Sequence, residues 1–454
     1  MKIALLAMSG VRACDQELLR LGLTLPGFVD RSRIVASLPS LGLLCIAAHT
    51  PAGHELHYFE AEAAGREPPE IYGCDLVAIS TFTAQAADAY AIADKLRQAG
   101  VRVAIGGLHV SCVPEEALTH ADYVAVGEGE SVWAAIVAAA ERKAPPAIFR
   151  ASDFPPVDLA AQPVPRFDLL GERPYNRYTV QTTRGCPWRC EFCASTVMLH
   201  SSYRRRPVEH VVRDIAAIER LHPGAFIEFA DDNTFVDKTW GKALCRALLP
   251  LKVKWFTETD ISVAEDAELL ELMHEAGCRQ VLIGLESPTA PALTGLEQRA
   301  DRKARWAAGY ADAIRAIQSH GITVNGCFIL GLDGHTKDVF RQVEECAEAW
   351  ALFDVQITLL TSFPGTPLYD RLLAAGRLLE PTAWHLCTLF DVNFRPTGMT
   401  PQELREGIYW LSQRIYSDEA TRRRRKAFFQ HFSNEPGYPR RSSAPAEAIS
   451  PPSP

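Results

Sequence analysis

The stretch Thr183-Arg-Gly-Cys186-Pro-Trp-Arg-Cys190-Glu-Phe-Cys193 decides how this chain is interpreted. It follows a segment, residues 178–183, that the pattern predicts to be a β-strand. Thiolates are soft ligands suited to iron–sulfur clusters and to zinc. Three closely spaced cysteines can hold three corners of a four-iron cluster and leave the fourth iron open, which is what a catalytic metal needs.

Structural zinc is the alternative interpretation of these cysteines, and such sites usually have four protein ligands. His200 or a distant cysteine such as Cys245 would have to supply the fourth, because no second CxxC pair lies nearby. The chain has 12 cysteines in all. Most of the others lie in apolar segments, where Cys packs as a small hydrophobe. In a reducing compartment, clustered cysteines indicate metal rather than disulfides.

Composition indicates a globular protein with a substantial core, because 47% of residues are hydrophobic and 22% are charged. The net charge of −8 offers no basic footprint for nucleic acid, so no nucleic-acid partner is expected. The N-terminal MKIALLAMSG lacks the cleavage region of a signal peptide. Since no apolar run reaches the roughly 20 residues of a membrane span, we expect a cytoplasmic protein.

Alternating strand-like and helix-like segments predict an α/β protein with two sheets. Residues 1–142 are expected to form a doubly wound parallel sheet of the Rossmann or flavodoxin type. Residues 143–176 are rich in proline and are interpreted as a linker. Residues 177–375 predict a partial (β/α)6 barrel, 376–433 a helical extension, and 434–454 a disordered tail.

Polar residues follow three of the predicted barrel strands, and active residues in such barrels lie at the C-terminal strand ends. Asp231, Asp232 and Asn233 follow the second strand, Glu258 follows the third and Glu286 closes the fourth. Other interpretations remain open for each group. Asp and Asn favour helix N-caps, Glu258 would suit a solvated loop, and Glu286 would suit an ion pair, for example with Arg279.

The cysteine motif, with Phe192 before its last cysteine, resembles the signature of the radical S-adenosylmethionine (SAM) superfamily. The resemblance implies a [4Fe–4S] cluster on Cys186, Cys190 and Cys193, whose open iron binds SAM. One-electron reduction then yields a 5′-deoxyadenosyl radical, and an external donor such as flavodoxin or ferredoxin would supply the electron. The residues implied in SAM binding are Phe192, Asp231, Asp232, Asn233, Glu258 and Glu286.

The first ~140 residues resemble the cobalamin-binding domain that precedes many radical SAM domains, in which ligands bind beyond the carboxyl ends of the strands. One departure is that Ser9-Gly-Val-Arg-Ala-Cys-Asp-Gln contains no histidine to ligate cobalt, which implies an unligated lower face. A degenerate domain that only packs on the barrel is the alternative. The residues implied in cobalamin binding are Ser80, Thr81, Thr83, Gly106, Gly107, His109, Gly127, Glu128 and Gly129.

Together these resemblances predict a cobalamin-dependent radical SAM C-methyltransferase that acts on an unactivated carbon of a small molecule. A radical SAM cyclase or oxidoreductase without methyl transfer is the first alternative, and a zinc-stabilised binding protein is the second. Two basic runs, Tyr203–Arg206 and Arg422–Lys426, are interpreted as solvated charged surfaces rather than as binding sites.

Overall fold

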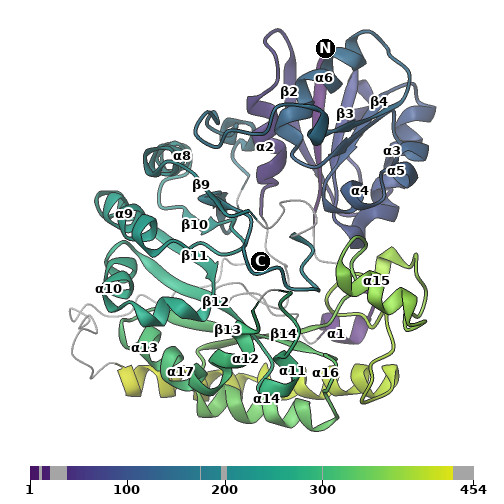
Figure 1. Ribbon diagram of the computed structural model, residues 1–454. Helices are drawn as coiled ribbons and strands as arrows, with labels where there is room; N and C mark the ends of the chain where they lie inside the picture. Colours follow the sequence, from purple (N-terminus) through teal and green to yellow (C-terminus); the bar gives the residue numbers. More distant parts are fainter. Residues whose placement is uncertain (10–12, 21–37, 174, 196–201, 299, 433–454) are drawn as a thin grey trace.

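The computed structural model describes residues 1–9, 13–20, 38–173, 175–195, 202–298 and 300–432, and the predicted tail and His200 lie outside this part. Two parallel sheets surrounded by helices make up the molecule (Figure 1). None of the helices in the described part combines the length and the apolar character of a membrane span.

The first sheet has the strand order β2-β1-β3-β4-β5-β6 and is parallel throughout. Its strands are β1 (Lys2–Met8), β2 (Glu55–Ala61), β3 (Leu76–Ser80), β4 (Arg102–Gly106), β5 (Tyr123–Val126) and β6 (Ala147–Arg150). Strand β1 pairs with both β2 and β3, so the winding direction reverses there and opens a crevice at the carboxyl edge. This arrangement confirms the predicted doubly wound sheet.

Helices cover both faces of this sheet, and for that reason β1 reads as a nearly continuous apolar run. Ile3 and Leu5 belong to one core cluster, with apolar side chains of α2 (Leu41–Ala48) and α6 (Gly129–Glu141). Ala4 and Leu6 belong to a second cluster, with α3 (Ala86–Gln98), α4 (Leu108–Cys112) and α5 (Pro114–His120). The first cluster continues into the barrel, so the two domains share one apolar core.

Part of the predicted linker is a strand. Residues Ala147–Arg150 form β6, which pairs with β5 and extends the first sheet by one strand. Prolines on both sides of this short segment concealed it in the sequence, because proline argues against a regular strand. Further along the same stretch, the Tyr175 hydroxyl donates to Glu60 at 2.7 Å and ties the segment to β2.

The second sheet has the order β14-β13-β12-β11-β10-β7 and is also parallel, which confirms the predicted six-stranded partial barrel. Its strands are β7 (Tyr178–Val180), β10 (Phe226–Phe229), β11 (Lys254–Thr259), β12 (Cys278–Glu286), β13 (Thr323–Leu330) and β14 (Asp354–Leu359). The outer helices are α8 (Val208–Leu221), α9 (Lys238–Leu248), α10 (Ala267–Glu275), α13 (Tyr310–Ser319) and α14 (Asp338–Ala349). Among the described strands, β7 and β14 do not pair with each other, so the barrel is open.

The strand predicted before the cysteines is divided in two. Strand β7 ends at Val180, and β8 (Thr183–Arg184) pairs antiparallel with β9 (Arg204–Arg205). The interpretation of Tyr203–Arg206 as a solvated run is therefore wrong for Arg204 and Arg206, whereas Arg205 is exposed. Arg204 is bonded to Glu128, and Arg206 is buried and pairs with Asp214 at 2.7 Å.

The C-terminal extension contains α15 (Pro367–Ala374), α16 (Pro401–Ile415) and α17 (Asp418–Phe432). Thr400 caps α16 as its sequence predicts, because its side chain accepts from the backbone of Glu403 while the Glu403 side chain bonds back to Thr400. The solvated interpretation of the Arg422–Lys426 run is wrong for Arg424, which is buried and donates to the Ile415 carbonyl at 2.9 Å.

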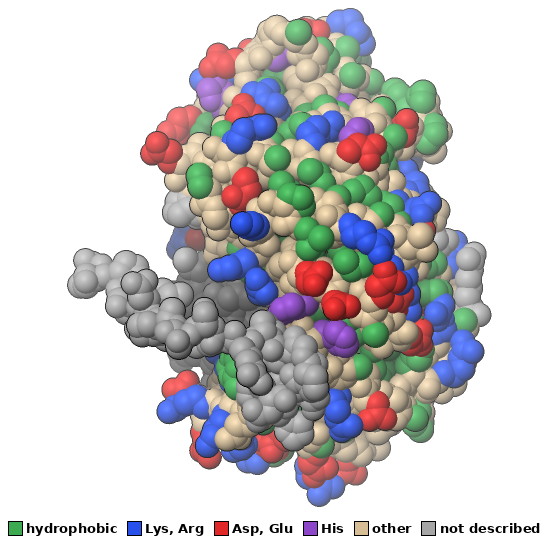
Figure 2. Space-filling view, turned by 90° about the vertical axis from the view of Figure 1, so that its left-hand side faces the viewer, with side chains coloured by type: hydrophobic (Ala, Val, Ile, Leu, Met, Phe, Trp, Pro, Cys, Tyr) green, Lys and Arg blue, Asp and Glu red, His purple; other side chains and the backbone are tan. Residues whose placement is uncertain are grey.

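Charges of both signs are mixed over the face that carries the outer helices α8, α9 and α10 (Figure 2). No large area of a single sign stands out on that face.

Candidate functional site

The three motif cysteines line one cavity of about 400 Å³ inside the open barrel, at the carboxyl ends of its strands. Their loop is seated from two sides. The Glu191 N–H donates to the Leu296 carbonyl at 2.8 Å, and the Leu368 N–H donates to the Glu191 carbonyl at 3.0 Å. The cavity is also lined by five residues predicted to bind SAM, namely Phe192, Asp232, Asn233, Glu258 and Glu286.

The cysteines fit a cluster better than a single zinc ion. Burial raises the pKa of Cys186 to about 12, so its thiol stays protonated unless a metal replaces the proton. Within the described residues, no set of three or more His, Cys, Asp or Glu side chains is arranged to hold one metal ion. A four-iron cluster does not need such a set, since each cysteine binds a different iron. Cys245, proposed as a fourth zinc ligand, is buried in the apolar core outside the cavity lining.

Asp231 lies behind the cavity instead of lining it, which departs from the predicted contact with SAM. One carboxylate oxygen accepts from the backbone N–H groups of Thr182 and Thr183 at 2.8 and 2.9 Å. The other accepts from the hydroxyls of Thr182 and Thr234. Burial raises the pKa of Asp231 to about 6. This carboxylate therefore holds the start of the cysteine loop against β10.

Asp232, the next residue, lines the cavity with an unsatisfied oxygen. Hydrogen bonds from Ser195 and from the Gly185 backbone reach its carboxylate, whereas its Oδ2 atom is buried with no hydrogen-bond partner. Leaving a buried acceptor unpaired costs about 1–3 kcal/mol. A carboxylate held in this way fits a cationic ligand such as the ammonium group of SAM.

Asn233 and Trp188 organise the floor of the cavity through Asp260. The Asn233 amide donates to Asp260 at 2.8 Å, and the Trp188 indole donates to the same carboxylate at 2.9 Å. Hydrogen bonds from Ser262, Asn233 and Trp188 together hold the pKa of Asp260 below its usual range despite burial. Asp260, which the sequence interpretation did not select, is therefore the residue that fixes the orientation of Asn233.

Glu258 lines the cavity beside other acidic side chains. Desolvation inside the cavity, together with the nearby carboxylates of Glu228 and Asp232, raises its pKa to about 8. Arg177 is buried below it and is engaged by Glu228 at 2.6 Å. Glu258 is exposed at the end of β11, where it lines the cavity, and a carboxyl group with a raised pKa can donate as well as accept a hydrogen bond.

Glu286 is paired with Lys303 rather than with Arg279, which corrects the partner named in the alternative interpretation. The Lys303 amine donates to Glu286 Oε1 and to the Gly284 carbonyl, both at 2.8 Å, and also lines the cavity. Glu286 has a φ of 63° at an irregularity in the pairing of β12 with β13. That unusual backbone turns its carboxylate toward the cavity.

A second cavity of about 380 Å³ lies between the first sheet and the barrel. Apolar side chains form much of its wall, including Leu41, Ile46, Trp133 and Phe82, whose side chain is 62% exposed. Six of the predicted cobalamin-binding residues line it, namely Ser80, Gly106, Gly107, Gly127, Glu128 and Gly129.

The backbone of this cavity requires glycine at Gly107. Its φ is 119°, and an added Cβ would lie 2.3 Å from the Thr81 carbonyl oxygen. A surface of bare backbone and apolar side chains, at the carboxyl ends of β3, β4 and β5, fits a large flat ligand such as a corrin.

Thr81, Thr83 and His109 do not line the second cavity, contrary to the predicted cobalamin contacts. Thr81 donates its hydroxyl to the Phe82 carbonyl at 3.1 Å, and Thr83 is buried. His109 is fully buried on the other face of the sheet, with its ring 5.3 Å from the ring of Trp384. Burial lowers the pKa of His109. The prediction placed His109 on a strand end, but it belongs to α4.

The two cavities adjoin through a single loop. Gln181 and Arg184 line the second cavity, and Cys186, two residues later, lines the first. At the end of β10, Ala230 lines the second cavity and Asp232 lines the first. Ligands of the two cavities would thus face each other across the cysteine loop.

Known families match both parts of the chain. Residues 180–347 match the Radical SAM superfamily, residues 29–137 match the B12 binding domain, and residues 366–450 match a domain of unknown function. The first two matches coincide with the barrel and with the first sheet.

Named relatives match most of the chain. The chain is 26% identical over 393 residues to the bacteriochlorophyllide d C-12(1)-methyltransferase of Chlorobaculum tepidum, covering 86% of this chain and 84% of that protein. It is also 26% identical over 391 residues to the anaerobic magnesium-protoporphyrin IX monomethyl ester cyclase of Cereibacter sphaeroides, covering 79% of this chain and 62% of the cyclase.

A solved structure shares the fold. The radical SAM methyltransferase TsrM from Kitasatospora setae, determined with cobalamin and a [4Fe–4S] cluster bound, superposes with a TM-score of 0.63 at 15% identity. The match covers 92% of this chain and 89% of TsrM. The motif, the two sheets and the two family matches agree, and the chain therefore belongs to the radical SAM superfamily and carries an N-terminal B12-binding domain.

Proposed function

We propose that this chain is a cobalamin-dependent radical SAM C-methyltransferase that acts on an unactivated carbon of a small molecule. One observation carries the proposal: the cysteine-lined cavity and the glycine-lined cavity adjoin through the loop that bears the cysteines. When bound, the cluster and SAM supply a 5′-deoxyadenosyl radical and cobalamin supplies the methyl group.

Cys186, Cys190 and Cys193 would hold the cluster in the cavity at the carboxyl ends of the barrel strands. Asp232 would receive the SAM ammonium group on its unpaired Oδ2 atom. Asn233, fixed by Asp260, would provide a further polar contact beside it. The chemistry of this donor set, three thiolates and one free carboxylate oxygen, matches the two groups that must bind together.

Glu258 and Glu286 would contact SAM in different ways. Protonated Glu258 adds a hydrogen-bond donor without adding charge, which suits a ribose hydroxyl. Glu286 stays an ion pair with Lys303, so this side of the cavity is close to neutral. The lysine thereby limits the number of uncompensated negative charges near a cluster that carries thiolate ligands.

Cobalamin would bind between the domains on Ser80, Gly106, Gly107, Gly127, Glu128 and Gly129. Phe82 is a further candidate, because its largely exposed ring is part of the cavity wall. The absence of histidine from residues 9–16 and the burial of His109 away from the cavity support a cobalt whose lower face has no histidine ligand.

A radical SAM cyclase or oxidoreductase is the alternative to methyl transfer, and it would use the same cofactors. The chain spans less than two thirds of the length of the cyclase it resembles. We propose an external protein such as flavodoxin or ferredoxin as the electron donor. A product that carries labelled carbon from the SAM methyl group supports methyl transfer. SAM cleavage with no methyl group incorporated into the product supports the cyclase or oxidoreductase.

The cluster assignment is tested by anaerobic reconstitution of the Cys186→Ala variant. The wild-type protein is expected to bind about four irons and to form 5′-deoxyadenosine from SAM under dithionite. Cys186→Ala is expected to lose deoxyadenosine formation by at least about 100-fold, as one cluster ligand is missing. Cys14→Ser, at an exposed cysteine, is the matched control and should behave as the wild type. Zinc in place of iron in oxygen-free protein would contradict the proposal.

A further inference from the structure

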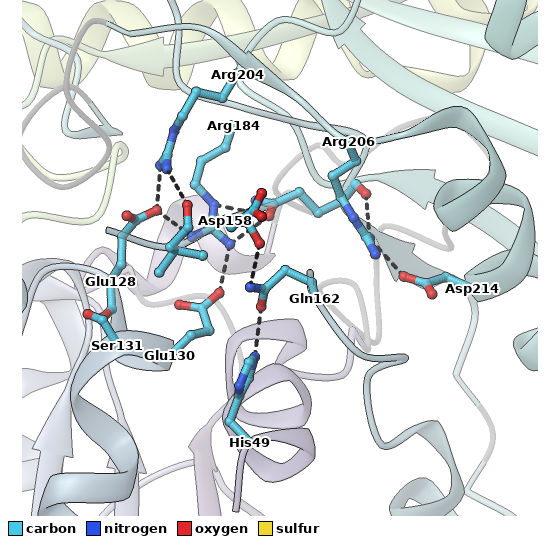
Figure 3. Close-up of polar contacts among 12 residues, drawn as sticks. His49, Glu128, Glu130, Ser131, Asp158, Gln162, Arg184, Arg204, Arg206 and Asp214 are labelled. Carbon is cyan, nitrogen blue, oxygen red and sulfur yellow. Dashed lines mark hydrogen bonds and ion pairs between the residues drawn. The ribbon is translucent and has the colours of Figure 1, made fainter. Parts of the chain in front are cut away.

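Arg184 joins the two domains at the point where their cavities meet (Figure 3). It lies on β8, two residues before Cys186, and its side chain is buried. Its guanidinium donates to Glu128 Oε1 at 2.5 Å and to Glu130 Oε1 at 2.7 Å. It also donates to Gln181 of its own domain at 2.7 Å. Both ends of this guanidinium are thus engaged across the domain boundary.

The two acids belong to the loop that lines the second cavity. Glu128 and Glu130 alternate with Gly127 and Gly129, which contribute bare backbone to the cavity wall. Glu128 is the N-cap of α6, where the helix dipole favours negative charge. The loop that would contact cobalamin is therefore tied directly to the loop that bears the cysteines.

A second arginine depends on the same acid. Arg204 lies opposite Arg184 in the β8–β9 pair, and it also donates to Glu128 Oε1 at 2.5 Å. Like charges directly opposite each other destabilise an antiparallel pair, and Glu128 compensates both. These bonds hold the pKa of Glu128 below its usual range despite burial. The β8–β9 hairpin thus has its geometry set partly by a residue of the other domain.

The cysteine loop also has an anchor that does not involve Arg184. Asp231 binds the backbone of Thr182 and Thr183 from within the barrel. Removing the guanidinium should consequently leave the cysteine cavity formed while freeing the loop at Glu128 and Glu130. The two functions of the site, SAM cleavage and communication with cobalamin, become separable at this residue.

We infer that Arg184 is a positioning residue that sets the spacing and orientation of the cobalamin cavity relative to the cluster cavity. The inference rests on the proposed function, since it concerns how the two cofactor sites face each other. Charge-assisted hydrogen bonds in a buried site are short and directional, so they define one arrangement of the loops. Without Arg184, Glu130 loses its guanidinium partner and Glu128 keeps only Arg204, so the two neighbouring acids are less compensated.

The experiment uses Arg184→Gln and Arg184→Lys in the full-length protein, reconstituted with iron, sulfide and hydroxocobalamin. Deoxyadenosine formation from SAM under dithionite measures the cluster cavity alone. Methylcobalamin formation, with cob(I)alamin generated by titanium(III) citrate, measures contact between the cavities. In that assay the methyl group of SAM passes to cob(I)alamin and S-adenosylhomocysteine is released. Pulsed electron paramagnetic resonance of cob(II)alamin beside the reduced cluster gives their separation without turnover.

Arg184→Gln is expected to keep deoxyadenosine formation within about 2-fold of the wild type and to lose methylcobalamin formation by at least about 10-fold, an energy of about 1.4 kcal/mol. Its cobalt–cluster distance distribution should broaden or shift. Arg184→Lys keeps the positive charge but not the planar set of guanidinium donors. Its methylcobalamin formation should therefore fall between that of the wild type and that of Arg184→Gln. Arg166→Gln, which removes an exposed ion pair with Asp168 near the same boundary, is the control and should match the wild type.

Equal losses of both activities, or unchanged methylcobalamin formation with an unchanged distance, would overturn the inference. If Arg184→Gln does not fold, Glu130→Gln provides the test from the other domain, because it keeps an acceptor for Arg184 and removes one charge. Its methylcobalamin formation should fall with deoxyadenosine retained. A wild-type protein that takes up no cobalamin contradicts the proposed function itself, and this result is distinguished before any variant is compared.

Discussion

At the scale of single residues, Glu258 makes the stability of the protein depend on pH. Its pKa is raised to about 8 in the folded state, against an ordinary 4.5. The folded protein therefore holds a proton that the unfolded chain has released between these values, and stability is lost as pH rises through this range. Glu258→Gln has no such proton to lose, so its stability should not fall in this way. The difference between its Tm and the Tm of the wild type should increase by a few degrees from pH 5 to pH 8 and then level off. A constant difference would contradict the raised pKa of Glu258.

The chemistry of several site residues was predictable one residue at a time. Three cysteines at cluster spacing and acids at strand ends, such as Asp232 and Glu258, follow from local sequence and from the barrel rule. Lys303 was missed because it follows β12 by 17 positions and reaches Glu286 through an irregular segment. Asp231 and Asp232 are adjacent in the sequence, but Asp231 binds the backbone of the cysteine loop and Asp232 lines the cavity. The sequence pattern does not distinguish these two orientations.

At the scale of elements, the turn from β4 into α4 can be tested by comparing adjacent glycines. Gly107→Ala puts a side chain at a φ of 119° and 2.3 Å from the Thr81 carbonyl, so it should lose about 2–4 kcal/mol of stability. Gly106→Ala meets only the Ala125 methyl at 3.4 Å and should lose less than about 1 kcal/mol. Both residues line the second cavity, so urea unfolding without cobalamin separates backbone strain from crowding of a ligand. Equal losses for the two variants would show that φ at Gly107 does not matter.

Most helices and strands were predictable because their apolar patterns match the faces that they bury. The exceptions are short elements whose stability comes from their partners. Strand β6 is only 4 residues long and exists because β5 offers it a parallel edge. Strands β8 and β9 have 2 residues each and are held by Glu128 from another domain. Tertiary contacts of this kind leave no periodic trace in the sequence.

At the scale of the whole molecule, the arrangement of three parts decides residue roles that no single domain predicts. His109 was expected in the cobalamin site, and it is instead covered by Trp384 of the C-terminal extension. The same extension meets the N-terminal segment, where Asp391 accepts from the backbone of Cys14 at 2.7 Å and of Asp15 at 3.1 Å. The extension thus bridges the N-terminal domain and the barrel. Its Trp384 contacts Glu116 of the N-terminal domain, which lies 268 positions earlier in the sequence.

This bridge predicts how the protein unfolds. The apolar core is continuous from α2 and α6 into the barrel, so the wild type should unfold in one calorimetric transition. Trp384 adds an indole N–H bond to Glu116 at 3.1 Å and an edge contact with His109. Trp384→Ala removes both and should cost about 2–4 kcal/mol, loosening the N-terminal domain so that it melts first as a separate transition. Trp410→Ala, at a tryptophan 39% exposed on α16, should leave a single transition. If Trp384→Ala also melts in one transition at the wild-type temperature, Trp384 does not couple the domains, and their relative placement rests on other contacts, such as those of Arg184, and on the shared core.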